Sequence, residues 1–205
     1  MKRRGFTLLE ILIVIALLGS LLLLLFGTHL QIRQLLAEQS KASQKTGDIL
    51  AFLKTLSSDL HNLVYEKWNS RQHFIARKVI MGGRRLDELL FTTSRLYNNP
   101  ASLQTQVHNV HYFADIADGE SAVVYRREDV FADPKNLRQG YAIPMAWDIE
   151  ELVFEFSQSG QSWEDEWDFA VKQVMPRFIR CTLKWKEGGQ ERMFQFVVRP
   201  PILWY

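Results

Sequence analysis

The amino end of the chain is an apolar run that is long enough to cross a membrane and that holds one carboxylate. Residues 6–27 are apolar or small, apart from Thr7, Ser20 and Glu10. As a helix, these 22 residues would be about 33 Å long at ~1.5 Å per residue, against roughly 30 Å of hydrocarbon in a bilayer. The sequence therefore predicts a transmembrane helix.

Three cations, Lys2, Arg3 and Arg4, directly precede this run, and the run itself contains none. Positive charge beside a membrane helix stays in the cytoplasm, so the rest of the chain is expected on the far side. The three cations also account for the net charge of +2, because the chain from Phe6 onward carries −1. The body of the protein therefore has no general electrostatic surface for nucleic acid.

A cleaved signal peptide and an ordinary uncleaved anchor are the alternatives for this run. The run is longer than a usual signal-peptide core, and Gly27, Thr28 and His29 do not form a small-x-small cleavage site. An ordinary anchor accounts for everything except Glu10. A charge at membrane depth costs about 2.5–3.5 kcal/mol and normally has a partner. Glu10 follows Arg4 by six residues, so it can lie near the headgroups, or it can be protonated. The other alternative is that a neighbouring chain supplies the partner of its charge.

The stretch Arg-Gly-Phe-Thr-Leu-Leu-Glu at residues 4–10 resembles the processing site of type IV prepilins and type II secretion pseudopilins. In that family a prepilin peptidase cuts after the glycine and methylates the new amino terminus. The resemblance implies cleavage between Gly5 and Phe6 and methylation of Phe6. Glu10 is then expected to pair with the terminal amine of a neighbouring subunit. Such a pair at about 4 Å gains ~4 kcal/mol at an effective dielectric of 20, before desolvation.

The helix is predicted to continue past Gly27, because no proline or cluster of turn residues follows until beyond Asn62. An apolar stripe with steps of four and three residues marks its second half, at Ile49, Leu53, Leu56, Leu60 and Leu63. Residues 39–46 are mostly polar, which disfavours a coiled-coil dimer. The stripe is therefore expected to pack on the chain's own domain.

After Val64 the apolar period changes to two, which is typical of strands. The clearest prediction is a hairpin of residues 179–186 and 193–199, with 187–190 as its turn. Further strands are predicted at 88–93, 107–113, 122–127 and around Leu152, Phe154 and Phe156. The predicted fold class is α+β and pilin-like, with a long N-terminal helix on a mainly antiparallel sheet. The predicted segments are a leader (1–5), a transmembrane and filament-core helix (6–28), an amphipathic continuation (29–64) and a β-rich domain (65–205).

The other polar groups are better interpreted as surface or structural residues than as a metal-binding site. Residues 162–168 hold four carboxylates with Trp163 and Trp167, but they lack the order of an EF-hand. An acidic loop in water, held to the core by its tryptophans, is favoured over a calcium site. His108 and His111 are predicted on opposite faces of a strand, which does not favour zinc. The pairs at 84–85 and 126–127 are predicted to be surface arginines.

Catalytic chemistry has little support in this sequence. The single cysteine, Cys181, cannot close an internal disulfide, and its strand position predicts that it faces the core. The motifs of serine hydrolases, zinc proteases and phosphate-binding loops are absent. We therefore predict no enzyme activity, no metal and no cofactor.

The C-terminal half resembles the J-type minor pseudopilin of type II secretion. The resemblance rests on a Phe-Glu-Phe strand ending at Phe156, on Gly160 with the two tryptophans, and on Met175-Pro176 before a hairpin. Phe156 and Met175 stand where tyrosine and leucine are commoner. The alternatives are a minor pilin of a type IV pilus or competence system, and a signal-anchored periplasmic domain with binding or hydrolytic activity.

The J-type resemblance implies a place in the cell and a set of partners. The chain is expected in the inner membrane as a single-pass protein with a cytoplasmic amino end and a periplasmic domain. It would join the I, K and H minor pseudopilins and the major pseudopilin near the filament tip, and help to initiate assembly. The prepilin peptidase and inner-membrane lipid are its other expected partners, and nucleic acid is not.

Overall fold

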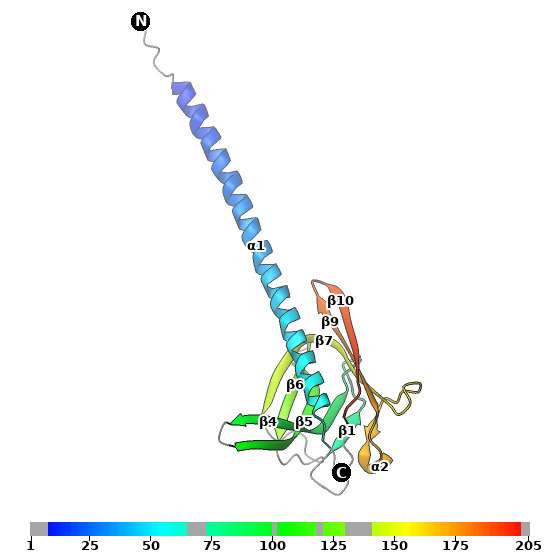
Figure 1. Cartoon of the computed structure of the whole chain (residues 1–205). Coiled ribbons are helices and arrows are strands. Elements are labelled where there is room, and N and C mark those ends of the chain that lie inside the picture. Colours follow the sequence, from blue (N-terminus) through cyan, green and yellow to red (C-terminus); the bar gives the residue numbers. More distant parts are fainter. Residues whose placement is uncertain (1–7, 65–72, 100–101, 118–120, 130–140, 202–205) are drawn as a thin grey trace. The chain divides into compact units, whose positions relative to one another are not determined.

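In a computed structural model, the described residues are 8–64, 73–99, 102–117, 121–129 and 141–201 (Figure 1). One helix, α1 (Leu8–His61), opens this part of the chain. The chain divides into two compact units, one ending at Gln44 and the other beginning at Lys45. The predicted helix is therefore confirmed, with its end close to where the sequence placed it.

The second unit is built around an eight-stranded sheet with the order β10-β9-β7-β6-β5-β4-β1-β8. All of its neighbouring strands are antiparallel, as the sequence predicted. The sheet curves around the part of α1 that belongs to this unit (Figure 1). Its strands are β1 (Phe74–Arg77), β4 (Glu88–Asn99), β5 (Ser102–Ala117), β6 (Ser121–Asp129), β7 (Ala142–Ser157), β8 (Trp167–Asp168), β9 (Phe178–Glu187) and β10 (Gln190–Val198).

Three short elements complete the fold. β2 (Ile80–Met81) and β3 (Arg84–Arg85) pair as a separate small hairpin, and α2 (Phe169–Lys172) is a single turn after β8. The sequence did not predict these elements, nor β1 and β8. Segments of two to four residues are too short to show a period, so only their neighbours reveal them.

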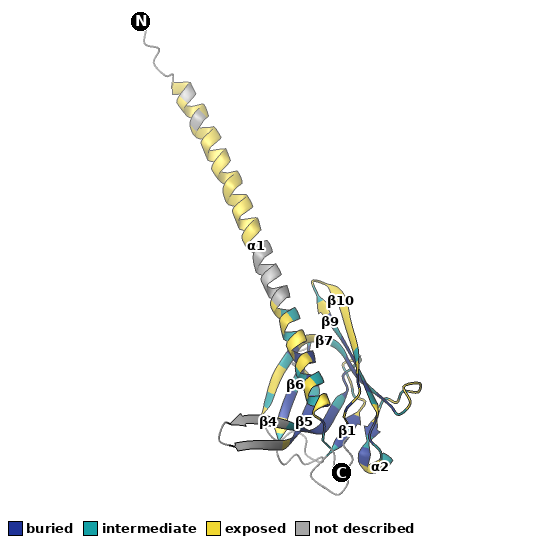
Figure 2. Cartoon of the chain, viewed as in Figure 1, coloured by how far each residue is buried: buried dark blue, intermediate teal, exposed yellow. Residues whose placement is uncertain are grey.

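The apolar stripe of α1 packs into the core as predicted. Figure 2 shows this buried face beside an exposed one. Leu56 and Leu60 are fully buried, and so is Phe52, which the predicted stripe omitted. Leu50 is exposed on the other side of the helix. Fully burying a leucine-sized side chain contributes about 1.5–3 kcal/mol, so this face holds the helix and the sheet together. The whole predicted stripe is buried, at Ile49, Leu53, Leu56, Leu60 and Leu63.

The last hairpin matches its prediction closely. Gly188 and Gly189 form its two-residue turn at φ 58° and 80°, a left-handed region that glycine enters without strain. Ile179, Cys181 and Leu183 of β9 are buried against the core. On the opposite face of the same strand, cations pair with β7 carboxylates. These pairs are Arg180 with Glu155 at 2.6 Å, Lys184 with Glu151, and Lys186 with Glu150 at 3.1 Å.

Asp59 joins the end of α1 to the sheet through a buried polar network. Its Oδ2 accepts hydrogen bonds from Tyr112 Oη at 2.6 Å and from Arg126 Nε at 2.8 Å. Arg126 also bonds Glu128 at 2.5 Å. Burial, together with the charge of Asp59, raises the pKa of Tyr112 well above its usual value, so the hydroxyl stays protonated. The predicted surface position of Arg126 and Arg127 is wrong, since they are only 6% and 9% exposed.

Asp87 is a second buried carboxylate, 1% exposed. It accepts hydrogen bonds from Arg85, at 2.8 Å from Nη2, and from the Phe154 backbone N–H at 3.0 Å. Its own N–H donates to Leu152 O at 2.8 Å. Burial raises its pKa despite the guanidinium. Arg85 is therefore not a free surface charge, because it compensates a carboxylate that fastens the start of β4 to β7.

Removing the Asp59 carboxylate should destabilise the domain. We expect Asp59→Ala to cost about 1–3 kcal/mol, because it removes the acceptor of the buried Tyr112 hydroxyl and one acceptor of the buried Arg126 guanidinium. Thermal unfolding of the full chain in detergent measures the loss. Asp48→Ala, on the same helix, should shift the transition by about 0.5 kcal/mol or less. Equal shifts for the two variants would contradict a special role for Asp59.

The thiol of Cys181 should be inert in the folded protein. It is fully buried, and burial raises its pKa well above that of a free thiol, so little thiolate forms. A maleimide reagent at pH 8 should leave the native protein unlabelled and add one label after denaturation, as measured by intact mass. Rapid labelling of the native chain would show that the β7–β9 core opens readily.

Candidate functional site

One segment of α1 has the length and composition of a membrane span. Ile11–Arg33 covers 23 residues with a mean hydropathy of 2.8. Every described side chain in it is exposed, including large apolar ones such as Leu23 at 76% and Leu24 at 69% (Figure 2). Among the described residues, none covers this apolar surface. Only lipid or the apolar helices of other subunits can remove it from water.

The hydroxyls within the span are bonded to their own helix. Ser20 Oγ donates to Leu17 O at 2.8 Å, and Thr28 Oγ1 donates to Leu25 O at 2.9 Å. Such bonds to the preceding turn satisfy a hydroxyl without water. These two side chains therefore fit an apolar surrounding, which leaves Glu10 as the acidic residue that needs a separate explanation.

The predicted site residues lie at the start of this helix. Gly5 and Phe6 are outside the described residues. Glu10 belongs to α1, in the first turn of its described part. Its side chain is not among those that the structure describes. The cleavage, the methylation and the pairing of Glu10 therefore stay predictions.

The domain holds α1 by polar contacts where the second unit begins. Lys45 Nζ lies 2.8 Å from Asp148 Oδ2 and also donates to Lys186 O. Thr46 Oγ1 donates to Glu187 Oε1 at 2.5 Å. Asp148 adopts φ 56°, between Ala146 and Ile149, where the register of β7 with β6 is irregular. These contacts tie the first turn of the packed helix to β7 and to the β9–β10 turn.

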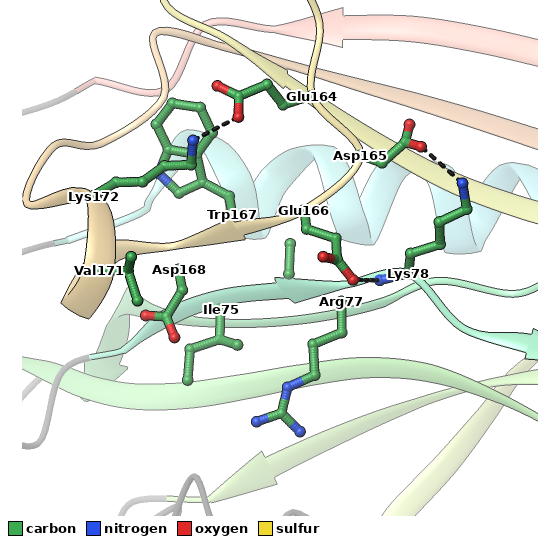
Figure 3. A pocket seen from close by; sticks show the side chains of 11 residues that line it. Ile75, Arg77, Lys78, Glu164, Asp165, Glu166, Trp167, Asp168, Val171 and Lys172 are labelled. Carbon is green, nitrogen blue, oxygen red and sulfur yellow. Dashed lines mark hydrogen bonds and ion pairs between the residues drawn. The ribbon is translucent and has the colours of Figure 1, made fainter.

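A hollow of about 760 Å³ lies beside β1 and β8, at the acidic loop (Figure 3). Trp167 is only 2% exposed and donates from Nε1 to Val174 O at 3.0 Å, so it anchors the loop as predicted. Lys172 lies 4.5 Å from the centre of its ring. The guanidinium of Arg180 lies over the Trp163 ring at 4.1 Å.

The four carboxylates of the loop have partners within the protein. Asp165 pairs with Lys78 at 2.9 Å and with Arg85 at 3.1 Å, and the hydrogen bond from Lys78 lowers its pKa. Glu164 pairs with Lys172, Glu166 accepts from the Lys78 backbone, and Asp168 accepts from the Ala170 backbone. Across the described ranges, no three His, Cys, Asp or Glu residues are grouped to hold a metal ion. The geometry is that of a loop fastened to β1.

The two histidines of β5 do not converge on a shared site. His108 lies opposite Thr93 of β4, and its Nε2 is 3.6 Å from Glu128. His111 lies 3.7 Å from Glu88, and its ring stacks on Phe113 at 4.8 Å. They contact different carboxylates, as expected for residues on opposite faces of a strand. Both are buried, at 9% and 6% exposed.

Sequence reasoning missed Asp59 and Asp87, although each leaves a faint signal. Asp59 directly precedes Leu60 of the apolar stripe, so it borders the buried face of the helix. Arg85 and Asp87 are two residues apart, which places them on one face of an extended segment. The partners Tyr112 and Phe154 come from distant strands, and only the fold brings them near.

Comparison with known families covers almost the whole chain. The family described as "Type II secretion system (T2SS), protein J" matches residues 28–197. The family described as "Prokaryotic N-terminal methylation motif" matches residues 1–26. No curated protein matches the chain.

The two family matches agree with the structure. The methylation motif precedes and overlaps the exposed apolar helix, and the protein J match spans the rest of α1 and the antiparallel sheet. Pseudopilins are structural parts of a secretion machine, and a single N-terminal helix anchors them in a membrane. The chain belongs to the type II secretion system protein J family and is a minor pseudopilin of that system.

Proposed function

We propose that this pseudopilin acts near the tip of the pseudopilus, where it helps to initiate the filament that exports proteins across the outer membrane. The observation that carries the proposal is the exposed apolar segment Ile11–Arg33, which follows a methylation motif and precedes a protein J domain. A helix with apolar surface on all sides is suited to leave lipid for a bundle of similar helices.

The partners proposed for this bundle are the I, K and H minor pseudopilins and the major pseudopilin. The helix supplies the general contact, because every pseudopilin carries a similar apolar segment. The folded domain then selects neighbours by shape and charge. No catalytic activity is assigned to it, and its described polar clusters are accounted for by internal pairs.

Processing by the prepilin peptidase is proposed between Gly5 and Phe6, with methylation of Phe6. Removing residues 1–5 takes away three cations and creates one amine at the start of the helix. The proposed segments are then the leader (1–5), the transmembrane and filament helix (6–28), the amphipathic continuation (29–64) and the β-rich domain (65–205).

Glu10 is proposed to set the position of the subunit in the filament. It lies four residues after Phe6, about 6 Å along a helix at ~1.5 Å per residue. Its carboxylate can then face the amine of a neighbouring subunit that is shifted along the filament axis. In lipid, a paired charge costs far less than an isolated one, so the pair favours one stagger over others.

The orientation proposed is an amino end in the cytoplasm and the domain in the periplasm, with the helix in the inner membrane. Lys2, Arg3 and Arg4 support it, because cations before the first helix stay in the cytoplasm. The peptidase site then lies on the cytoplasmic side, where the family is processed.

Cleavage can be tested by intact mass and N-terminal sequencing. In cells with an active prepilin peptidase, the mature chain should begin at a methylated Phe6. A strain without the peptidase should keep Met1, and Gly5→Val should block cleavage in the normal strain, because the enzyme is expected to require glycine there. A chain that still carries residues 1–5 beside an active peptidase would refute the processing proposal.

Neutralising Glu10 should weaken assembly and leave membrane insertion unchanged. We expect Glu10→Gln to lower recovery of sister pseudopilins in a pull-down by roughly tenfold, which corresponds to a loss of about 1.4 kcal/mol. Secretion of an exported protein should fall with it. Ser20→Ala is the matched control, since that hydroxyl bonds only its own helix among the described residues. Undiminished recovery and secretion with Glu10→Gln would remove the charge-pairing role.

A further inference from the structure

β10 is an edge strand of the eight-stranded sheet (Figure 1). Within the described part of the chain it pairs only with β9. Natural edge strands are usually protected by charges, prolines or bulges. The stretch 193–198 of β10 has none of these, and Met193, Phe194 and Val197 are 63%, 43% and 52% exposed. These residues place apolar side chains on both faces of the edge.

The register of the hairpin shows which backbone groups are free. The two-residue turn makes Glu187 and Gln190 a hydrogen-bonded pair, and such pairs alternate along an antiparallel ladder. Even-numbered residues of β10 therefore bond β9. The N–H and C=O groups of Glu191, Met193, Gln195 and Val197 point to the free edge. Another extended backbone satisfies such a row, whereas a helix does not.

The sequence of this edge is complementary to itself. Reversed about Gln195, the stretch 191–199 places Glu191 opposite Arg199, Met193 opposite Val197, and Phe194 opposite Phe196. All of these side chains are exposed or half-buried. We propose that a second copy of this chain pairs with β10 edge to edge, antiparallel, with a two-fold axis at Gln195.

Charge and backbone chemistry select this register over its neighbours. If the second copy is shifted by two residues toward the hairpin turn, Arg199 lies opposite Gly189 of the turn. Glu191 and Arg199 then have no oppositely charged partner. A shift the other way places Glu191 opposite Pro201, which has no N–H to donate. In the centred register, odd-numbered residues meet odd-numbered residues, so all their free groups can bond across the axis.

The pairing would also cover the exposed apolar side chains. On one face, Met193 would contact Val197 of the second copy. Gln195 would lie at the axis, with its amide donating to Thr182 Oγ1 of β9 at 2.9 Å. On the other face, Phe194 would contact Phe196 of the second copy. Cross-strand pairs of this kind are the main source of sheet stability. The two eight-stranded sheets would form one continuous sheet.

This inference goes beyond the proposed function and does not depend on it. The edge belongs to the folded domain, and neither cleavage at Gly5 nor the charge of Glu10 takes part. A homodimer through β10 is a state of the subunit distinct from helix packing in a filament.

Disulfide cross-linking of the full chain in native membranes tests the pairing. In Gln195→Cys, two copies of residue 195 would face each other with Cα atoms about 5.5 Å apart, within the range of about 4.4–6.8 Å for a disulfide. Mild oxidation should give a reducible dimer on a gel. Cys181 is buried and does not compete, so the unmodified chain should give no disulfide-linked dimer on the gel.

Neighbouring positions provide the matched controls. In Met193→Cys alone, the two thiols would be about four residues apart along the strand, roughly 13 Å, which is too far for a disulfide. A mixture of Met193→Cys and Val197→Cys chains should cross-link. Ser159→Cys, in an exposed loop, measures random collisions in the membrane. Equal dimer from residues 193, 195 and 159, or no dimer from residue 195, would overturn the proposal.

Charge exchange tests the register independently. In the Gln195→Cys background, Glu191→Arg or Arg199→Glu should lower the dimer yield several-fold, because each change places like charges opposite each other at both ends. The double exchange should restore the yield. A yield that is unchanged by the single variants, or not restored by the double one, would overturn this register.

Discussion

The structure depends on the burial of one face of α1 against a curved antiparallel sheet. Phe52, Leu56 and Leu60 are fully buried there, and the Asp59 carboxylate at the same end of the helix holds Arg126 and Tyr112. Apolar burial supplies most of the free energy, whereas the buried ionic bonds select one placement of the helix, since a shift would leave a charge without its partner. The part of α1 that belongs to the second unit is therefore held in one defined rotation against the sheet.

The same helix carries two kinds of apolar surface, and each has a different role. From Lys45 onward the apolar residues form a stripe that the domain covers. From Ile11 to Arg33 they occur on every side and remain exposed. The first kind stabilises a fold, and the second can be covered only by lipid or other helices. A minor pseudopilin needs both, because it must wait in a membrane and then join a filament.

Polar groups of the domain mainly connect its secondary-structure elements through hydrogen bonds and ion pairs. Asp87 joins β4 to β7, and Asp165 joins the acidic loop to Lys78 and Arg85. Lys45 joins the start of the packed helix to Asp148. The charged groups of these contacts are paired inside the domain, so they do not indicate a metal or substrate site. The edge of β10 is different, because among the described residues its outer backbone groups have no strand partner and its apolar side chains are exposed.

The sequence by itself determined the apolar span, the stripe at Ile49 to Leu63, the antiparallel sheet and the last hairpin, because periodicity and turn glycines act over a few neighbouring residues. Strands β4 and β5 proved longer than predicted, and β1 and β8 were missed, since short or polar segments become strands only when a neighbour supplies hydrogen bonds. The tertiary structure alone decided that Arg126 is buried and Arg85 half-buried beside carboxylates, and that β10 lies at an edge. Burial, charge pairing and strand order depend on residues far apart in the chain, which no local pattern encodes.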